Sequence, residues 1–73
     1  MKEYYNYLRA SAKTDMEQTL IADLIGALTN AELLVENEEK YDNFRFFAKT
    51  ALEKSLLADV YEAIFQFKEQ QEV

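Results

Sequence analysis

The stretch Thr14-Asp15-Met16-Glu17 is a capping box, a motif that marks the start of a helix. In this motif the Thr14 hydroxyl accepts a hydrogen bond from the backbone N–H of Glu17. The Glu17 carboxylate in turn accepts one from the backbone N–H of Thr14. A second match occurs at Thr50-Ala51-Leu52-Glu53. The two matches predict that one helix begins near residue 14 and another near residue 50.

The helix predicted after Thr14 has an apolar stripe at helical spacing. Its members are Met16, Leu20, Ile21, Leu24 and Leu28. Gly26 interrupts this helix, and a glycine inside a helix costs about 1 kcal/mol relative to alanine. We interpret Gly26 as a position that allows a bend or a close helix crossing.

Towards the N-terminus, helical spacing predicts another helix from about Glu3 to Lys13. Its amphipathic face comprises Tyr4, Tyr7, Leu8 and Ser11. Tyr5 lies off this stripe, so we expect it to be exposed.

Between residues 29 and 39 the helical pattern weakens. We interpret this segment as a connection with a buried apolar plug at Leu33-Leu34-Val35. Asn37 is a candidate N-cap for the next helix, because Glu38 and Glu39 would then lie favourably at the positive end of the helix dipole.

The C-terminal half has two predicted helices, with a break between Lys49 and Ser55. The alternative is one continuous helix from Glu38 to Glu69, since no residue between them forbids it. The polar end, residues 68–73, is expected to fray. The predicted inward face of the third helix comprises Tyr41, Phe44, Phe47 and Ala48, and that of the last helix comprises Leu57, Val60, Tyr61 and Ile64. The predicted core comprises Tyr4, Leu8, Leu20, Leu24, Phe44, Phe47, Val60 and Ile64.

The composition agrees with an all-α fold. The 73 residues are 49% hydrophobic, with one glycine and no proline, which favours a single domain over residues 1–73. We expect the chain to have no internal repeat. We predict a compact bundle of four or five short helices. No stretch has the roughly 20 consecutive apolar residues of a membrane span, and residues 1–6 lack the apolar region of a signal peptide. We therefore expect a soluble, cytoplasmic protein.

The absence of cysteine and histidine excludes most catalytic and metal-binding chemistry. The acidic cluster of Glu36, Glu38 and Glu39 lacks the alternating oxygen ligands and central glycine of a calcium loop, so we interpret it as a solvated helix start. The carboxylate pairs Asp15 with Glu17 and Asp59 with Glu62 lie on predicted polar faces, without the shelter that acid–base catalysis needs. We predict no enzyme, no cofactor and no metal.

Charge argues against nucleic acid as a partner. Fourteen acidic residues outnumber eight basic ones, and the net charge of −6 repels a phosphate backbone. The acidic excess is greatest over residues 14–39, which contain no basic residue. The opposing feature is a small basic and aromatic spot, where Arg45 and Lys49 are four residues apart on the third predicted helix with Phe46 between them.

Four sequence patterns together resemble the YozE family, small Gram-positive bacterial and phage-borne proteins described as sterile-alpha-motif-like. The patterns are Tyr4-Tyr5-x-Tyr7-Leu8, Ile21-Ala22-Asp23-Leu24, Tyr41-x-x-Phe44-x-x-Phe47 and Val60-x-Glu62-Ala63-Ile64-x-x-Phe67. The resemblance implies a sterile-alpha-motif-like bundle of four or five helices. It implies little about function, because the family has no established activity. The chain departs from the family where a Phe-Pro pair usually precedes the third helix.

Ten aromatic rings exceed what four short helices can easily hide. We therefore expect a non-enzymatic module that binds another protein or a second copy of itself. The candidate partner-binding residues are Tyr5, Glu36, Glu38, Glu39, Phe46 and Phe65. One alternative is a phage-type inhibitor whose acidic surface imitates nucleic acid, and a weaker one is a small nucleic-acid-binding domain.

Overall fold

Both capping boxes start helices where the sequence predicted. A computed structural model of the chain describes residues 2–71, and in it α2 spans Asp15–Ala27 and α5 spans Ala51–Gln71. Residues 48–50 separate α5 from the helix before it, so the alternative of one continuous helix from Glu38 to Glu69 is wrong. The cause is the second capping box, in which the N–H of Glu53 donates to the Thr50 hydroxyl over 3.0 Å.

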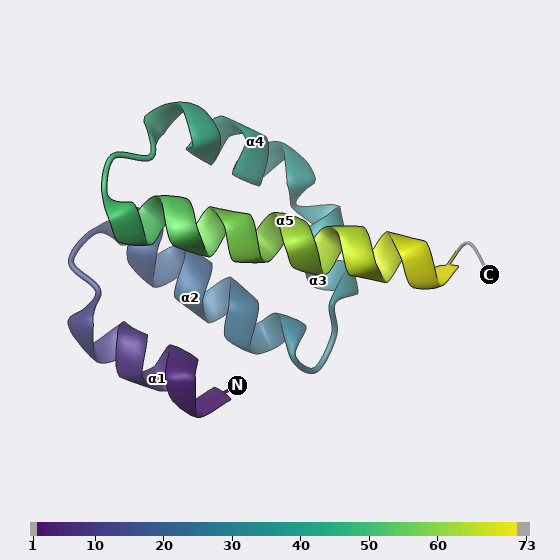
Figure 1. Cartoon of the computed structure of the whole chain (residues 1–73), viewed down its shortest axis with the longest axis horizontal. Coiled ribbons are helices and arrows are strands. Elements are labelled where there is room, and N and C mark those ends of the chain that lie inside the picture. The colour runs from purple at the N-terminus through teal and green to yellow at the C-terminus, as the bar shows by residue number, and fades with distance from the viewer. Residues whose placement is uncertain (1, 72–73) are drawn as a thin grey trace.

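Three further helices complete the fold (Figure 1): α1 (Lys2–Ser11), α3 (Glu32–Glu36) and α4 (Glu38–Phe47). The connection after α2 is thus itself a short helix, and the fold is an all-α bundle of five helices over the described residues. Of the predicted plug Leu33-Leu34-Val35, Leu34 is completely buried, whereas Leu33 is 41% exposed. Asn37 precedes α4 but does not cap it with its side chain, because its amide donates to the Leu33 carbonyl over 2.7 Å.

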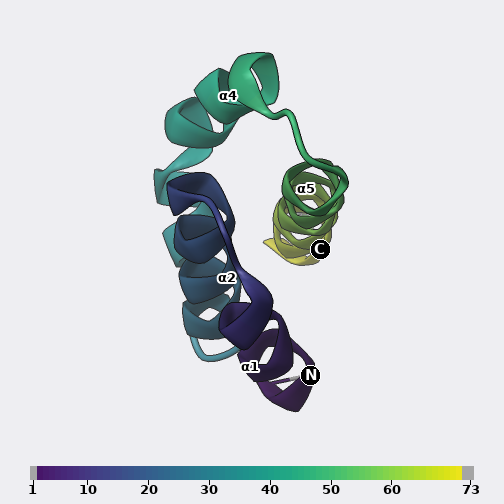
Figure 2. The same cartoon turned by 90° about the vertical axis from the view of Figure 1, so that its left-hand side faces the viewer.

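Helices α2 and α5 lie against each other at the centre of the bundle. Figure 1 and Figure 2 show α1 on the side of α2 and α4 on the side of α5, while α3 contacts both central helices. Over residues 2–71, none of these helices has the length and apolar composition that crossing a membrane requires.

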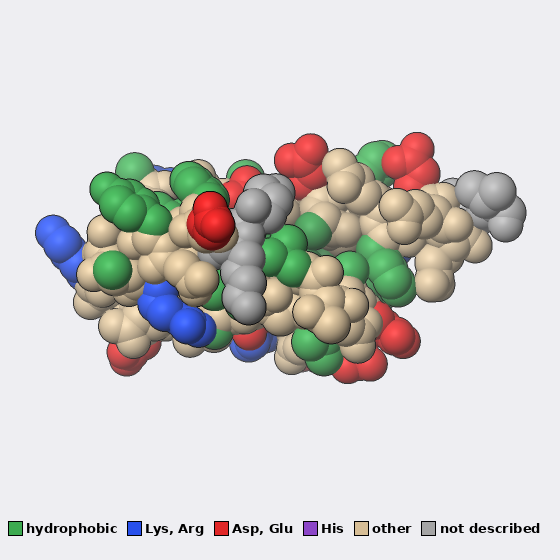
Figure 3. Space-filling model, turned by 90° about the horizontal axis from the view of Figure 1, so that it is seen from below, with side chains coloured by type: hydrophobic (Ala, Val, Ile, Leu, Met, Phe, Trp, Pro, Cys, Tyr) green, Lys and Arg blue, Asp and Glu red, His purple; other side chains and the backbone are tan. Residues whose placement is uncertain are grey.

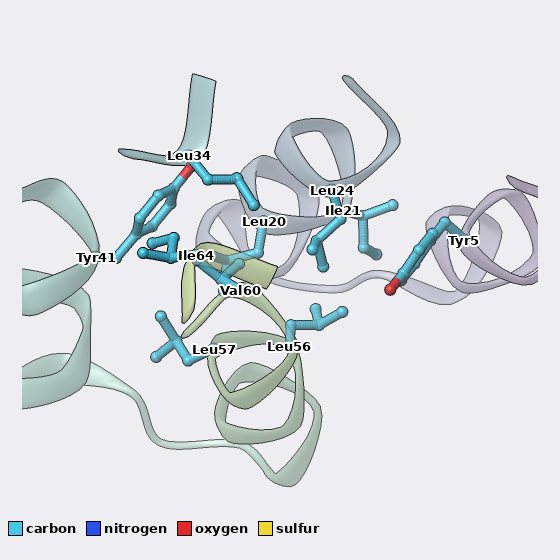
Figure 4. Close-up of a cluster of buried hydrophobic side chains, with 10 residues drawn as sticks. All are labelled: Tyr5, Leu20, Ile21, Leu24, Leu34, Tyr41, Leu56, Leu57, Val60 and Ile64. Carbon is cyan, nitrogen blue, oxygen red and sulfur yellow. The ribbon is translucent and has the colours of Figure 1, made fainter. Parts of the chain in front are cut away.

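The core is one cluster that draws side chains from all five helices (Figure 4). It comprises Tyr5, Leu20, Ile21, Leu24, Leu34, Tyr41, Leu56, Leu57, Val60 and Ile64. The predicted core positions Leu20, Leu24, Val60 and Ile64 are confirmed. Leu8 and Phe44 are partly buried and pack against the cluster.

Two predicted core residues are instead exposed. The exposed fraction is 54% for Tyr4 and 68% for Phe47. In α4, successive three-residue steps fall short of a 3.6-residue turn and rotate by about 60° each, so Phe47 lies far around the axis from Tyr41.

In α1 the helical spacing fits two faces that share Leu8. One face contains Tyr4 and the other contains Tyr5, which is buried with 5% exposure. The expectation that Tyr5 is exposed was therefore wrong. Each of the two faces carries a tyrosine, so periodicity alone does not show which face is buried.

The polar C-terminal end is helical for as far as the structure describes it. We expected residues 68–73 to fray, but α5 continues to Gln71, and Glu72 and Val73 lie outside the described residues. An ion pair between Lys68 Nζ and Glu38 Oε1, 2.6 Å long, joins this end of α5 to the start of α4.

The core assignment predicts unequal effects for two large apolar side chains. Leu20→Ala should lower the free energy of unfolding by about 2–5 kcal/mol, because it leaves a cavity between α2 and α5. Phe47→Ala should change it by less than about 0.5 kcal/mol, because the side chain is mostly in solvent. Urea denaturation of both variants measures the difference, and equal losses would contradict the assignment.

Gly26 does not mark a close helix crossing. A Cβ atom built at this position would meet Leu33 Cδ1 at 3.6 Å, which is an ordinary van der Waals contact, and its backbone has no positive φ. We expect Gly26→Ala to raise the free energy of unfolding by about 0.5–1 kcal/mol, because alanine loses less backbone entropy in a helix. Thermal unfolding tests this, and a lower melting temperature would show that the glycine is required.

Candidate functional site

The two capping boxes bind each other at the point where α2 and α5 begin. The Thr14 hydroxyl donates a hydrogen bond to Glu53 Oε2 over 2.8 Å. The Thr50 hydroxyl donates one to Glu17 Oε2 over 2.7 Å. Each threonine thus caps its own helix and also binds the glutamate of the other box.

The second oxygen of each glutamate binds the backbone of its own box. Glu17 Oε1 accepts the N–H groups of Lys13, over 2.7 Å, and Thr14, over 3.3 Å. Glu53 Oε1 accepts those of Lys49, over 2.6 Å, and Thr50, over 2.9 Å. Every carboxylate oxygen of the pair is therefore hydrogen-bonded.

These contacts fix the charge of both carboxylates. Their residues are only 4% and 5% exposed, and the hydrogen bonds to the carboxylates outweigh the cost of desolvation. The pKa of Glu17 is lowered chiefly by the backbone N–H of Lys13 and then by the Thr50 hydroxyl. The pKa of Glu53 is lowered chiefly by the backbone N–H groups of Thr50 and Lys49. A general acid needs the opposite shift, so this arrangement supports structure rather than catalysis.

Glu17 corrects our placement of the pair Asp15 and Glu17 on a polar face. Glu17 is buried and engaged by Thr50, whereas Asp15 is exposed in the first turn of α2. The pair does not share a sheltered site, because its two side chains face different surroundings.

The two capping boxes belong to an internal repeat, so the expectation that the chain has none is wrong. Residues 5–28 align with residues 41–64 at a constant offset of 36. The identical pairs are Tyr5/Tyr41, Arg9/Arg45, Ala12/Ala48, Lys13/Lys49, Thr14/Thr50, Glu17/Glu53, Leu20/Leu56, Ala22/Ala58, Asp23/Asp59 and Ala27/Ala63.

The repeat is structural as well as sequential. Helices α1 and α2 form one hairpin. Helices α4 and α5 form a second hairpin, whose buried positions match those of the first. The paired core positions are Tyr5/Tyr41, Leu20/Leu56, Ile21/Leu57 and Leu24/Val60, all buried. We call these units the first hairpin, residues 2–27, and the second hairpin, residues 38–71.

The sequence-predicted partner residues do not form one site. Tyr5 is buried on α1, Phe46 on α4 is 85% exposed and Phe65 on α5 is 65% exposed. In the acidic group, Glu36 ends α3 and is exposed, Glu39 is exposed on α4, and Glu38 pairs with Lys68.

Several acids of the 14–39 segment are also engaged within the fold. Besides Glu17 and Glu38, Asp23 Oδ2 accepts hydrogen bonds from Lys40 Nζ, over 2.8 Å, and from the Tyr41 hydroxyl, over 2.7 Å. Burial and the Asp23 carboxylate raise the pKa of Tyr41, so this phenol stays protonated and donates. The acidic segment is therefore less free to face a partner than its composition indicates.

The proposed basic spot on the third helix is also rearranged. Lys49 lies beyond the end of α4, where its backbone N–H binds Glu53, so it is not on one helical face with Arg45. Arg45 instead lies over the Tyr61 ring, with 5.4 Å from the guanidinium carbon to the ring centroid. The Tyr61 hydroxyl donates to Asp42 over 2.6 Å.

A groove that sequence reasoning missed lies between α1, α2 and α5. It has a volume of about 290 Å³, and Tyr5, Leu24 and Ala63 contribute its apolar lining while Asp59 and Glu62 contribute acidic groups. Burial raises the pKa of Asp59, and the nearby Glu62 carboxylate adds to this effect. We call it the Tyr5–Asp59 groove. The signal that could have found it is the repeat, which equates Asp59 with the engaged Asp23.

No arrangement for a metal ion is present among the described residues, in which no three carboxylates are grouped to hold one. The comparisons with known proteins add no assignment. No protein-family model matches the chain, and neither a curated protein nor a solved structure is significantly similar to it.

The paired boxes predict the acid sensitivity of the fold. Both glutamates have pKa values below the ordinary 4.5, so the folded state prefers them ionised. Their contribution to stability should be complete above about pH 4.5 and should disappear as the pH falls through the lowered values. The double variant Glu17→Gln, Glu53→Gln should be less stable near neutrality and should lose less stability in acid. Urea denaturation from about pH 3 to about pH 7 measures both effects.

The exposed carboxylates Glu36 and Glu39 provide the control for that experiment. Replacing both by glutamine should leave the pH dependence close to that of the wild type. If this control flattened the pH profile as much as the Glu17 and Glu53 variant does, the paired boxes would not be the source of the acid sensitivity.

Proposed function

We propose that the protein is a non-enzymatic module that binds another protein through exposed phenylalanines of its second hairpin. The observation that carries the proposal is Phe46 and Phe47, two adjacent phenylalanines at the end of α4 that are 85% and 68% exposed. Exposed aromatic side chains are enriched where proteins bind one another.

The internal repeat provides a control for what the fold itself needs. The first hairpin has Ala10 and Ser11 at the positions of Phe46 and Phe47, and both are exposed at the end of α1. Since the same scaffold position is satisfied by small side chains, the phenylalanines are not explained by packing. Phe65 adds another exposed ring on α5, just beyond the aligned part of the repeat.

The chemistry of the described residues supports binding over catalysis. The two most sheltered carboxylates, Glu17 and Glu53, have lowered pKa values and are held by hydrogen bonds within the fold. The sequence has no histidine or cysteine to act beside them. We place the module in the cytoplasm, and we extend the resemblance to the YozE family as a proposal supported by the four sequence patterns.

The acidic-surface alternative has less support. Glu17, Asp23 and Glu38 are engaged by Thr50, Lys40 and Lys68. A surface that imitates nucleic acid needs its charges free and regularly spaced towards the partner.

The test compares the wild type with Phe46→Ala, Phe47→Ser, which gives the second hairpin the residues of the first. A photo-crosslinking amino acid at Asn43, an exposed position one turn before Phe47, reports on proteins that contact this end of α4. In cells of the natural source, the wild type should form specific adducts that the double variant loses. The free energy of unfolding of the double variant should stay within about 0.5 kcal/mol of the wild-type value, because both side chains are exposed.

The matched control places the same crosslinker at Gln18, an exposed position on α2. Identical adducts from both positions, or adducts that the double variant retains in full, would contradict the proposed interface.

A further inference from the structure

The Tyr5–Asp59 groove has an internal counterpart that shows what it can hold. The offset of 36 relates Tyr5 to Tyr41, Asp59 to Asp23 and Ala63 to Ala27. The corresponding place beside Tyr41 is not empty, because α3 fills it. Figure 4 shows Leu34 next to the Tyr41 ring, and Leu34 is completely buried.

Helix α3 fills the place beside Tyr41 with Leu33 and Leu34, which lie on one helical turn. It contacts both α2 and α5, and Leu33 Cδ1 comes within 3.6 Å of the position that a Cβ at Gly26 would take. Gly26 is the counterpart of Glu62 in the groove. The second hairpin has no equivalent of α3 within the described residues, because α5 continues without a break to Gln71. Within residues 2–71, no segment therefore fills the groove as α3 fills the place beside Tyr41.

The two aspartates, Asp23 beside Tyr41 and Asp59 in the groove, also differ in their partners. Asp23 receives Lys40 in an ion pair of 2.8 Å and also receives the Tyr41 hydroxyl. Tyr4 stands where Lys40 stands in the other half, and among the described side chains no basic group forms an ion pair with Asp59. Among the described residues, Tyr5 also forms no hydrogen bond with Asp59, whereas Tyr41 forms one with Asp23. Among the described side chains, Asp59 therefore has no partner that corresponds to Lys40.

We propose that the Tyr5–Asp59 groove binds a helical turn of another protein that carries a leucine and a lysine or arginine. The leucine takes the place against Tyr5 that Leu34 takes against Tyr41. The basic group takes the place at Asp59 that Lys40 takes at Asp23. This site is separate from Phe46 and Phe47, so it goes beyond the interface proposed above and can be tested without it.

The charge of the molecule favours a foreign basic segment over a second copy of the chain. The net charge of −6 makes two copies repel each other, whereas it attracts a basic helix. The groove combines apolar lining from Tyr5, Leu24 and Ala63 with the carboxylates of Asp59 and Glu62. Figure 3 views the molecule from below, where hydrophobic and acidic side chains lie among polar ones and the basic side chains lie towards the left. An apolar surface with an acidic border fits a leucine flanked by lysine or arginine.

The probe is a synthetic peptide derived from the internal plug. It has the sequence of residues 30–41 with Glu32, Glu36 and Glu39 replaced by lysine, so it keeps Leu33, Leu34 and Lys40 and adds positive charge. A matched control peptide also replaces both leucines by serine, which leaves the charge unchanged. Titration into the isotope-labelled full chain, followed by NMR chemical shifts, detects weak binding.

We expect the leucine peptide to bind with a Kd of about 1 mM or tighter and to shift the resonances of Tyr5, Leu28, Asp59 and Ala63. The serine control should bind at least about tenfold more weakly, because it lacks the apolar anchors. Asp59→Asn in the protein should weaken binding of the leucine peptide by about threefold to tenfold. Asp15→Asn, an exposed acid at the start of α2, should leave it unchanged.

Three results would overturn the proposal, and none of them depends on the Phe46 interface. Equal binding of the leucine and serine peptides would show a purely electrostatic association. Shifts centred on Tyr41 and Val60 would show that the peptide displaces α3 instead of entering the groove. Absence of any shift at millimolar peptide would show that the groove does not accept such a helix.

Discussion

The structure depends on the crossed hydrogen bonds between Thr14 and Glu53 and between Thr50 and Glu17. A helix start exposes N–H groups that must be satisfied, and two carboxylates in proximity repel each other. The crossed arrangement resolves both problems, since each glutamate accepts two backbone N–H groups and one hydroxyl. The positive ends of two helix dipoles further favour the negative charges. Because α2 and α5 begin at this one point, their apolar stripes are brought together along the centre of the bundle.

The duplication explains the rest of the architecture and its asymmetry. Each hairpin supplies one capping box, one buried tyrosine and one apolar stripe on its second helix. The two halves diverge after that helix. In the first half the chain turns back through α3, and Leu34 closes the space beside Tyr41; in the second half α5 continues straight to Gln71. The halves also differ on α4, where Phe46 and Phe47 stand at the positions of Ala10 and Ser11. The two functional proposals rest on these two differences.

The sequence predicted those features that depend on neighbours along the chain. Both capping boxes and the break before α5 follow from local spacing and local hydrogen bonds. The same spacing predicted the buried residues Leu20, Ile21 and Leu24 of α2, but it also included Leu28, which is 47% exposed. The burial of Tyr5 could not be predicted, because tyrosines stand on two competing faces of α1 and only packing against α2 selects between them. The pairing of the boxes joins residues 33 and 39 positions apart, which no local pattern encodes. The repeat could have been predicted, because ten of the 24 pairs between residues 5–28 and 41–64 are identical at a constant offset of 36.

The most direct test of the central claim is a double-mutant cycle with Thr14→Val and Thr50→Val, measured as free energies of unfolding in urea. Each substitution removes a hydroxyl that caps its own helix and binds the glutamate of the other box. If the two boxes act as one unit, the first substitution disrupts the contacts that the second would remove. The loss in the double variant should then differ from the sum of the single losses by clearly more than the about 0.3–0.5 kcal/mol expected of independent sites. Additive losses would contradict the account, because they would show two ordinary helix caps that do not depend on each other.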